Sequence, residues 1–248
     1  MNSMSKSLTS LSSVCGALLC VAVFGSACEP AASPTKDTTS AAQAAPAPAA
    51  PAPTAAAVAP SAPAPAVTVQ AVIGQPAPAF SLKDLEGNTV TLQQFKGRRV
   101  VLEWFNPNCP FVKAAHTKGS LVTAAAEAQK DGTVWLAINS AAPGKQGYGL
   151  ETNQAGKTSF HLTHPILLDE TGQVGHLYGA TNTPHLFVID ESGTLVYAGA
   201  VDNSPDGEGA SPEGGKLVSY VSQALAELTA KKPITVSSTK AYGCGVKY

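Results

Sequence analysis

The stretch from residue 41 to 66 limits what this chain can fold into more than any other feature does. It reads AAQAAPAPAAPAPTAAAVAPSAPAPA, which is almost entirely alanine and proline. Such a segment is too poor in large apolar side chains to form a core, and its prolines favour extended polyproline II structure. We therefore expect residues 29–69 to form a stalk, and any globular fold of this 248-residue chain to come from the residues that follow.

The segment before the stalk has the organisation of an export signal. Lys6 provides a positive charge, residues 8–24 are mostly apolar, and small residues precede Cys28. This pattern is typical of a signal peptide over residues 1–28, and the apolar part is too short and too rich in serine for a membrane helix. An ordinary cleaved signal and an uncleaved anchor are both compatible with it.

The end of this segment, Gly25-Ser26-Ala27-Cys28, resembles the lipobox of bacterial lipoproteins. The resemblance implies that Cys28 is acylated and becomes the mature N-terminus. The stalk that starts directly afterwards favours this interpretation, because it would hold a domain away from the membrane. We therefore expect an extracytoplasmic, lipid-anchored protein of the bacterial cell envelope, with the membrane as a partner.

Beyond the stalk, short apolar runs alternate with amphipathic segments. We expect strands at 89–92, 100–105, 134–138, 166–168, 186–190 and 195–199, and helices at 110–130, 150–160, 172–178 and 213–230. Within the first helix, Phe111, Ala115, Val122 and Ala125 recur at helical spacing, so we expect them to face the core. The alternation predicts an α/β fold, and a hairpin at residues 191–193 makes the sheet mixed.

Cys109 lies between the apolar run 100–105 and the first of these helices, in the motif NPNCP. Pro110 suits the first position of a helix, which puts Cys109 near the N-cap. There the free backbone N–H groups and the helix dipole stabilise a thiolate, and Lys113 one turn later adds positive charge. The pattern predicts a reactive thiol; a buried, inert cysteine is the alternative.

The order of these elements resembles the thioredoxin superfamily. The segments FSLKDLEGNTVTLQQFKG, NPNCPFVKAAH, LAINS, PILLDETGQVGHLYGATNTPHLFVID, GTLVYAGAVDNS and TKAYGCGVKY are similar to the AhpC/TSA redoxin family, and within it to the peroxiredoxin-like branch. The resemblance implies a thioredoxin-like mixed sheet flanked by helices at residues 70–232, followed by a cysteine-bearing tail at 233–248. It also implies a thiol-dependent oxidoreductase without a cofactor, which reduces peroxide or exchanges disulfides and is restored by a thiol reductant.

The chain departs from the family's active-site patterns around Cys109. Asn106 stands where thioredoxins have the first cysteine of C-x-x-C and where peroxiredoxins have Thr or Ser. The only arginines, Arg98 and Arg99, precede the strand before Cys109, so the late arginine of peroxiredoxins is missing. We expect Asn106, through its amide, and Lys113 to support the thiolate in its place.

A second thiol is available at Cys244. If Cys15 and Cys20 leave with the signal and Cys28 is lipidated, Cys109 and Cys244 are the two remaining cysteines. An oxidising compartment favours a disulfide between such a pair. Cys244 would then either tie the tail down or resolve oxidised Cys109. Both roles remain open, as does the absence of pairing.

The Thr183-Pro184 dipeptide resembles the cis-proline element of the same fold. The resemblance implies that the backbone of Thr183 is free to bind an extended substrate, with Trp104, Phe105 and His185 lining the same surface, Trp104 mainly through packing. An ordinary proline at the start of a strand is the alternative.

Two other features could indicate a metal, and we expect neither to bind one. His161 and His164 lack accompanying ligands, and residues 202–213 match the spacing of a calcium loop without its preceding helix. The formal net charge of −1 and the absence of a basic patch argue against a nucleic-acid partner. A non-catalytic binding module that uses the cis-proline groove and a tethered metal binder remain alternatives to the oxidoreductase.

The tether can be tested directly. Cys28→Ala is expected to release the protein from the membrane fraction or to block its maturation, because alanine cannot be acylated. Cell fractionation and mass spectrometry of the mature N-terminus measure both effects. A wild-type protein that is soluble and begins at another residue would contradict the prediction.

Overall fold

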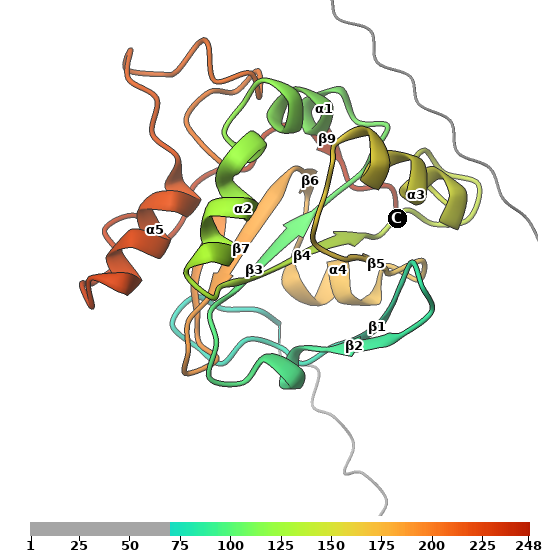
Figure 1. Cartoon of the computed structure of the whole chain (residues 1–248), viewed down its shortest axis with the longest axis horizontal. Helices are drawn as coiled ribbons and strands as arrows, with labels where there is room; N and C mark the ends of the chain where they lie inside the picture. The colour runs from blue at the N-terminus through green and yellow to red at the C-terminus, as the bar shows by residue number, and fades with distance from the viewer. Residues whose placement is uncertain (1–69) are drawn as a thin grey trace, which may run out of the picture. The chain divides into compact units, whose positions relative to one another are not determined.

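The computed structural model describes residues 70–248 (Figure 1). The predicted signal at 1–28, the stalk at 29–69 and Cys28 lie outside these residues. Within the described part of the chain, no helix has the length and apolar character needed to cross a membrane.

A seven-stranded mixed sheet forms the centre of the domain, in the order β2-β1-β5-β4-β3-β7-β8. β3 is parallel to β4, β4 is parallel to β5, and β3 is antiparallel to β7. The expectation of a thioredoxin-like mixed sheet is confirmed. The strands are β1 (Ser81–Asp84), β2 (Thr89–Thr91), β3 (Val100–Trp104), β4 (Val134–Asn139), β5 (Ile166–Leu168), β7 (His185–Ile189) and β8 (Leu195–Gly199).

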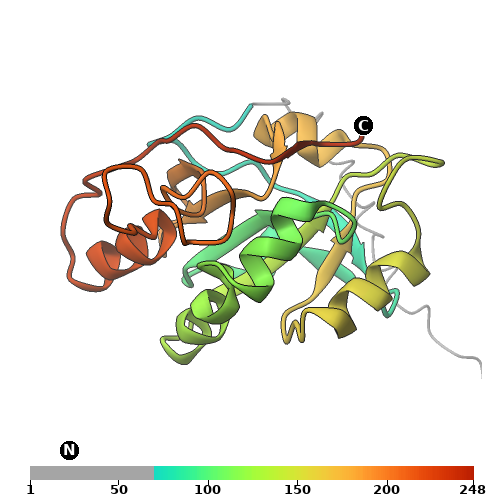
Figure 2. The same ribbon diagram turned by 90° about the horizontal axis from the view of Figure 1, so that it is seen from above.

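Helices cover both faces of this sheet (Figures 1 and 2). Residues of α1, α2 and α5 pack with Val101, Trp135 and Val188 on one face. Residues of α4 pack with Leu102 and Leu136 on the other. The helices are α1 (Pro110–Thr117), α2 (Leu121–Lys130), α3 (Leu150–Ser159), α4 (Gln173–Tyr178) and α5 (Tyr220–Thr229), and a 3-10 helix, η1 (Leu92–Phe95), follows β2.

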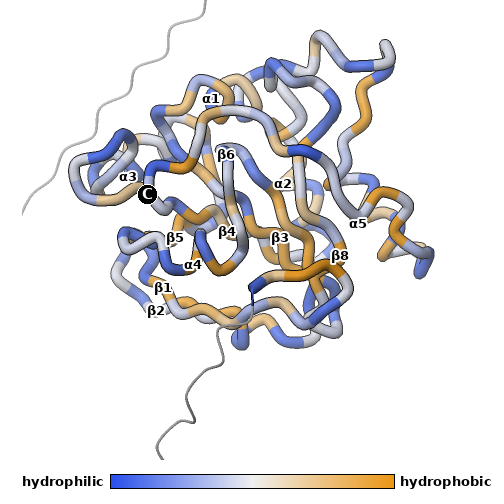
Figure 3. The backbone as a smooth tube through the Cα atoms, turned by 180° about the vertical axis from the view of Figure 1, so that it is seen from behind, coloured by the Kyte–Doolittle hydropathy of each residue, from blue (hydrophilic) through white to orange (hydrophobic). Residues whose placement is uncertain are grey.

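The two central strands are buried at every position, which explains their continuous apolar sequence. All residues of β3 and of β4 are buried. Alternate residues of each strand enter opposite layers, because successive side chains of a strand point to opposite faces. The tube in Figure 3 shows the same distribution, with the most hydrophobic backbone running through the middle of the sheet.

The predicted helix at 110–130 is two helices. The amides of Lys118 and Gly119 both donate to the Ala114 carbonyl, which ends α1, and α2 begins at Leu121. This break changes the phase of the helical pattern. Ala115 and Ala125 are buried as expected, but the prediction that Val122 faces the core is wrong, since 53% of Val122 is exposed.

The last helix is shorter than the predicted 213–230. It begins at Tyr220, where the Ser219 hydroxyl accepts a hydrogen bond from the Ser222 amide as an N-cap. The preceding residues form a loop instead, because the Asn203 side chain bonds to the backbone of Glu213, Lys216 and Val218.

A second, two-stranded sheet was not predicted. β6 (Asn182–Thr183) pairs antiparallel with β9 (Cys244–Gly245), which belongs to the C-terminal tail. Figure 1 shows β6 and β9 near the start of α1, at the end of the sheet where β3 leads into that helix. This pairing brings the tail to the region of Cys109.

The burial pattern predicts the response to core truncation. Leu136→Ala in β4, where the side chain is fully buried, should lower the free energy of unfolding by about 2–5 kcal/mol, because it leaves a cavity. Val122→Ala on α2 is the matched control and should change it by less than about 0.5 kcal/mol. Urea unfolding of the full chain measures both values. Equal losses would contradict the assigned faces of β4 and α2.

Candidate functional site: Cys109, Cys244 and the cis-proline

Cys109 is the N-cap residue of α1, as the sequence predicts. Its backbone is extended, with φ −81° and ψ 124°, and Pro110 is the first helical residue. The Cys109 amide donates to the Asn106 carbonyl at 3.0 Å, so the turn after β3 fixes where the helix starts. The residue is fully buried. Its sulfur therefore lies at the positive end of α1, which favours a thiolate.

The Thr183–Pro184 peptide bond is cis, as the resemblance implies. The carbonyl oxygen of Thr183 accepts a hydrogen bond from the Cys109 sulfur at 3.2 Å. The contact follows from the register of the sheet, because Trp104 at the end of β3 is opposite His185 at the start of β7. The residues just beyond these two ends, Cys109 and Thr183, meet at one place.

The C-terminal tail covers this place. Thr183 pairs with Cys244 and Asn182 pairs with Gly245. Cys244 packs against the cluster of buried residues that contains Cys109, and both are free thiols. The expectation that the backbone of Thr183 is free for a substrate is therefore wrong for this structure, since β9 already uses that edge. We call residues 237–248 the C-terminal strap.

The surroundings of the two thiols shift their acidity in opposite directions. Burial raises the pKa of Cys109, but hydrogen bonds with the Cys244 side chain, with Thr183 and with the Val112 and Cys244 amides outweigh it, so the pKa is lowered. Burial, the hydrogen bond to Cys109 and the nearby Cys109 charge raise the pKa of Cys244 to about 11. Cys109 is thus the thiol that ionises first, and Cys244 is the proton donor that stabilises it.

Asn106 and Lys113 lie near Cys109 in the chain, but neither side chain forms a hydrogen bond with its sulfur. The amide nitrogen of Asn106 donates to the Gln146 carbonyl at 2.9 Å, and its oxygen accepts from the Asn108 amide at 2.9 Å. Asn106 therefore fixes the turn that presents Cys109. Lys113 is exposed, and none of the groups that shift the Cys109 pKa belongs to it.

Trp104 belongs to the core rather than to a substrate surface. It is fully buried, its Nε1 donates to Ser140 Oγ at 3.0 Å, and its ring packs edge-on against Phe187. Phe105 and His185 are also buried. The expectation that Trp104 contributes mainly through packing is confirmed, and it has no exposed substrate surface, because β3 lies between β4 and β7 in the sheet.

A buried carboxylate below the site was missed by sequence reasoning. Glu103 Oε1 is 2.7 Å from His116 Nε2, and Glu103 Oε2 accepts from Trp135 Nε1 at 2.9 Å. Burial raises the pKa of Glu103, but attraction to His116 and their hydrogen bond lower it overall. The pair joins β3 to α1, the helix that carries Cys109. A glutamate within the apolar run VVLEW was the available signal.

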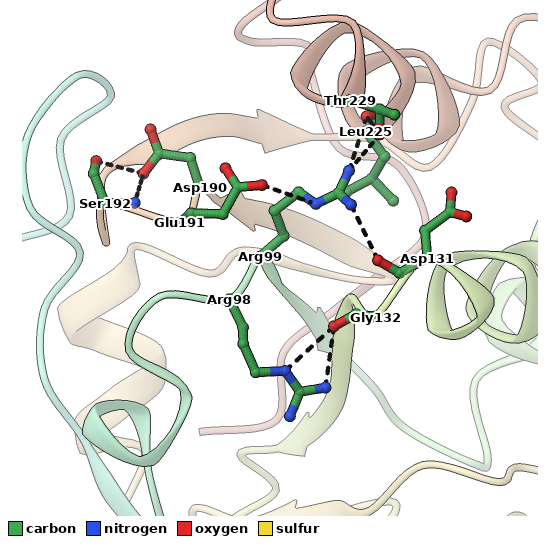
Figure 4. Close-up of polar contacts among 9 residues, drawn as sticks. All are labelled: Arg98, Arg99, Asp131, Gly132, Asp190, Glu191, Ser192, Leu225 and Thr229. Atoms are coloured by element: carbon green, nitrogen blue, oxygen red, sulfur yellow. Dashed lines mark hydrogen bonds and ion pairs between the residues drawn. The ribbon is translucent and has the colours of Figure 1, made fainter.

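The two arginines form their contacts at the end of the sheet where β3 begins, opposite the end that leads to Cys109 (Figure 4). Arg98 donates to the Gly132 carbonyl at 3.0 Å. Arg99 forms an ion pair with Glu191 at 3.3 Å and donates to the Asp131 carbonyl and to Thr229. Both residues precede β3, whereas Cys109 follows it, so both guanidinium groups support the fold and neither takes part in the site.

Neither candidate metal feature forms a ligand cluster. The Asp202 carboxylate accepts hydrogen bonds from the Ser204 amide, the Tyr242 hydroxyl and Ser120. His164 packs against Trp135, and burial lowers its pKa to about 4. Among residues 70–248, no three histidine, cysteine or acidic side chains are grouped as a metal site would require.

Comparisons with known proteins agree with this description. A family model described as Redoxin matches residues 73–213, a range that contains Cys109 and Pro184 but ends before Cys244. The thiol-disulfide oxidoreductase ResA of Geobacillus thermodenitrificans is 32% identical over 124 residues, or 50% of this chain and 66% of that protein. The chain thus spans slightly less than two thirds of that relative's length.

Two further comparisons cover more of the matched protein. A candidate peroxiredoxin of Mycobacterium tuberculosis is 30% identical over 146 residues, or 53% of this chain and 86% of that one. The crystal structure of a hypothetical protein from Sinorhizobium meliloti 1021 has a TM-score of 0.61 and 27% identity, and the match covers 71% of this chain and 94% of that chain.

The opposite shifts of the two thiols can be measured by alkylation. In Cys244→Ala the Cys109 pKa should rise, because the thiolate loses a hydrogen-bond donor. The rate of Cys109 alkylation by iodoacetamide against pH should therefore have a higher midpoint in this variant than in the wild type. Lys113→Ala is the control and should leave the midpoint nearly unchanged. A midpoint that is the same with and without Cys244 would contradict the effect of Cys244 on the Cys109 pKa.

Proposed function

The chain belongs to the Redoxin family, and from this we propose that it is a thiol oxidoreductase that cycles between a Cys109/Cys244 dithiol and a Cys109–Cys244 disulfide. One observation carries the proposal: Cys244 is paired with Thr183, whose carbonyl accepts from the Cys109 sulfur at the start of α1, and Cys244 packs against the buried cluster that contains Cys109. The ResA relative is named a thiol-disulfide oxidoreductase, which is the same class of activity.

Cys109 is the nucleophile in this proposal, because its pKa is lowered and that of Cys244 is raised. With a disulfide substrate, the Cys109 thiolate attacks one sulfur, the substrate S–S bond breaks, and the other sulfur leaves as a thiolate that takes up a proton. Cys244 then loses its proton and attacks the Cys109 sulfur. This step releases the second substrate thiol and leaves the Cys109–Cys244 disulfide.

With a peroxide the first step differs and the product is the same. The Cys109 thiolate attacks one peroxide oxygen, the O–O bond breaks, and the leaving oxygen takes up a proton as an alcohol or water. Cys244 then attacks the sulfur of the Cys109 sulfenic acid, and hydroxide leaves as water with the Cys244 proton. In both cases two electrons pass from the dithiol to the substrate, and an external dithiol must return them.

The remaining residues of the site position these two thiols. Asn106 fixes the turn before Cys109 through Gln146 and Asn108, and the cis bond at Pro184 turns the Thr183 carbonyl towards the sulfur. Lys113 is exposed on α1, one turn after Cys109, and has no positioning contact with either thiol. We also propose that Cys28 and the stalk at 29–69 hold the domain outside the cytoplasm, where a reversible disulfide can form.

The cycle predicts a specific covalent product. After one equivalent of hydrogen peroxide or of a small disulfide, peptide mapping of the wild type should find Cys109 linked to Cys244, and dithiothreitol should reverse the link. Cys109→Ser should show no oxidation at Cys244, because the nucleophile is gone. Cys244→Ser should stop at a Cys109 sulfenic acid or mixed disulfide and then form sulfinic acid with excess peroxide. Two free cysteines in the oxidised wild type would overturn the proposal.

A further inference from the structure

The C-terminal strap occupies the edge that an extended substrate would need. An antiparallel peptide can add to an exposed strand edge through its backbone hydrogen bonds. At β6 this position is taken by β9, with Cys244 opposite Thr183 and Gly245 opposite Asn182. Cys244 thus lies where the cysteine of a bound peptide would lie, packed against the buried cluster that contains Cys109.

The strap is fixed along its length on both sides of β9. On the side before β9, the Ala198 amide donates to the Ser237 carbonyl, and the Thr239 amide donates to the Ala198 carbonyl. On the side after it, the Val246 amide donates to the Thr181 carbonyl at 3.1 Å. The strap is therefore a regular extension of the fold, with hydrogen bonds that a competing peptide would have to replace.

The last residue anchors the end of the strap. The Tyr248 ring stacks on His176 with ring centroids 3.9 Å apart, and its hydroxyl donates to the Ala180 carbonyl at 2.7 Å. Gly175 makes room for this ring, because a Cβ at that position would be 2.5 Å from the Tyr248 hydroxyl. The surface of α4 is thus shaped to receive Tyr248.

Gly243 permits the close contact between the strap and the cis-proline segment. A Cβ at this position would lie 2.2 Å from the Thr183 carbonyl oxygen, and the backbone has φ +99°. Any side chain here would push β9 away from Thr183 without changing Cys109 or Cys244. This position offers a way to detach β9 while both cysteines stay in the chain.

We propose that the C-terminal strap selects the substrates of Cys109 by excluding extended polypeptide disulfides while it admits small oxidants. The inference rests on the proposed function, since it assigns a substrate class to the same thiol. A small oxidant reaches Cys109 through a local opening of the strap, because its attack requires access to one sulfur only. An extended peptide needs the Thr183 edge as well, so β9 must leave first.

Two probes that share the same leaving group can distinguish a small disulfide from an extended peptide disulfide as the substrate of Cys109. One is N-acetylcysteine methylamide and the other is a short extended peptide with a central cysteine, each carried as its mixed disulfide with thionitrobenzoate. The Cys109 thiolate attacks the cysteine sulfur of either probe, the S–S bond breaks, and thionitrobenzoate leaves as a coloured thiolate. Both rates are measured in the full-length Cys244→Ser protein, where the product on Cys109 cannot be resolved.

With the strap in place, the peptide probe should react about tenfold more slowly than the small probe. Adding Gly243→Ala should raise the peptide rate by about tenfold and change the small-probe rate much less, so the ratio of the two rates shifts. Gly132→Ala is the matched control, because Gly132 also has positive φ, at +77°, but has no atom within 4 Å of an added Cβ. It should leave the ratio unchanged.

Tyr248→Ala provides a second variant if Gly243→Ala does not fold. It removes the end anchor and should shift the ratio in the same direction, with faster hydrogen exchange at the Val246 amide as the sign that the strap has loosened. Equal rates for both probes with the strap docked, or a loosened strap with an unchanged ratio, would overturn the inference. If Cys109 reacts with neither probe in any variant, the proposed function fails instead.

Discussion

The pairing of β3 with its two neighbours is the interaction on which the site depends. β3 is hydrogen-bonded to β4 on one side and to β7 on the other, and each of its residues is buried. The register with β7 places Trp104 opposite His185. Cys109 follows Trp104 in the chain and Thr183 precedes His185, so this register brings the Cys109 sulfur to the Thr183 carbonyl. The register is fixed because a shift of one residue would expose the buried side chains of β3.

This arrangement gives two cysteine thiols different pKa values. Cys109 lies at a helix N-terminus, and Cys244, Thr183 and Val112 lower its pKa, whereas Cys244 lies on a strand and not at a helix end. The proton of Cys244 stabilises the Cys109 thiolate, and the same contact makes Cys244 the harder thiol to ionise. Oxidation of Cys109 removes its negative charge, and with it one of the causes that keep Cys244 protonated.

Elements with strong local signals could be predicted from the sequence. The strands at 166–168 and 195–199 have the bounds expected, because each is an apolar run between turns. Cys109 as N-cap followed from Pro110 alone. Val122 was misplaced because the break after Thr117 changes the helical phase, and the only local marks of that break are Gly119 and the N-cap residue Ser120.

The parts of the site that could not be predicted depend on contacts between distant residues. β9 has two residues, and its partner β6 also has two, so neither carries a pattern of its own. Their pairing depends on the strap, whose anchors at Ala198 and on α4 are far apart in the sequence. Trp104 was expected to contribute mainly through packing, and it does so because its strand is paired with β4 on one side and with β7 on the other.

The strap therefore links two properties of the site: the resolution of oxidised Cys109 by Cys244, and the exclusion of peptides from the Thr183 edge. A cysteine on an unattached tail could reach Cys109 only by diffusion of the tail, and the Thr183 edge would stay open between encounters. Here β9 holds Cys244 beside Cys109, so resolution is in effect an intramolecular step between oriented groups. The hydrogen bonds that provide this orientation are the ones that close the edge. Fast resolution and exclusion of peptides thus have one structural cause, and a change that weakens one also weakens the other.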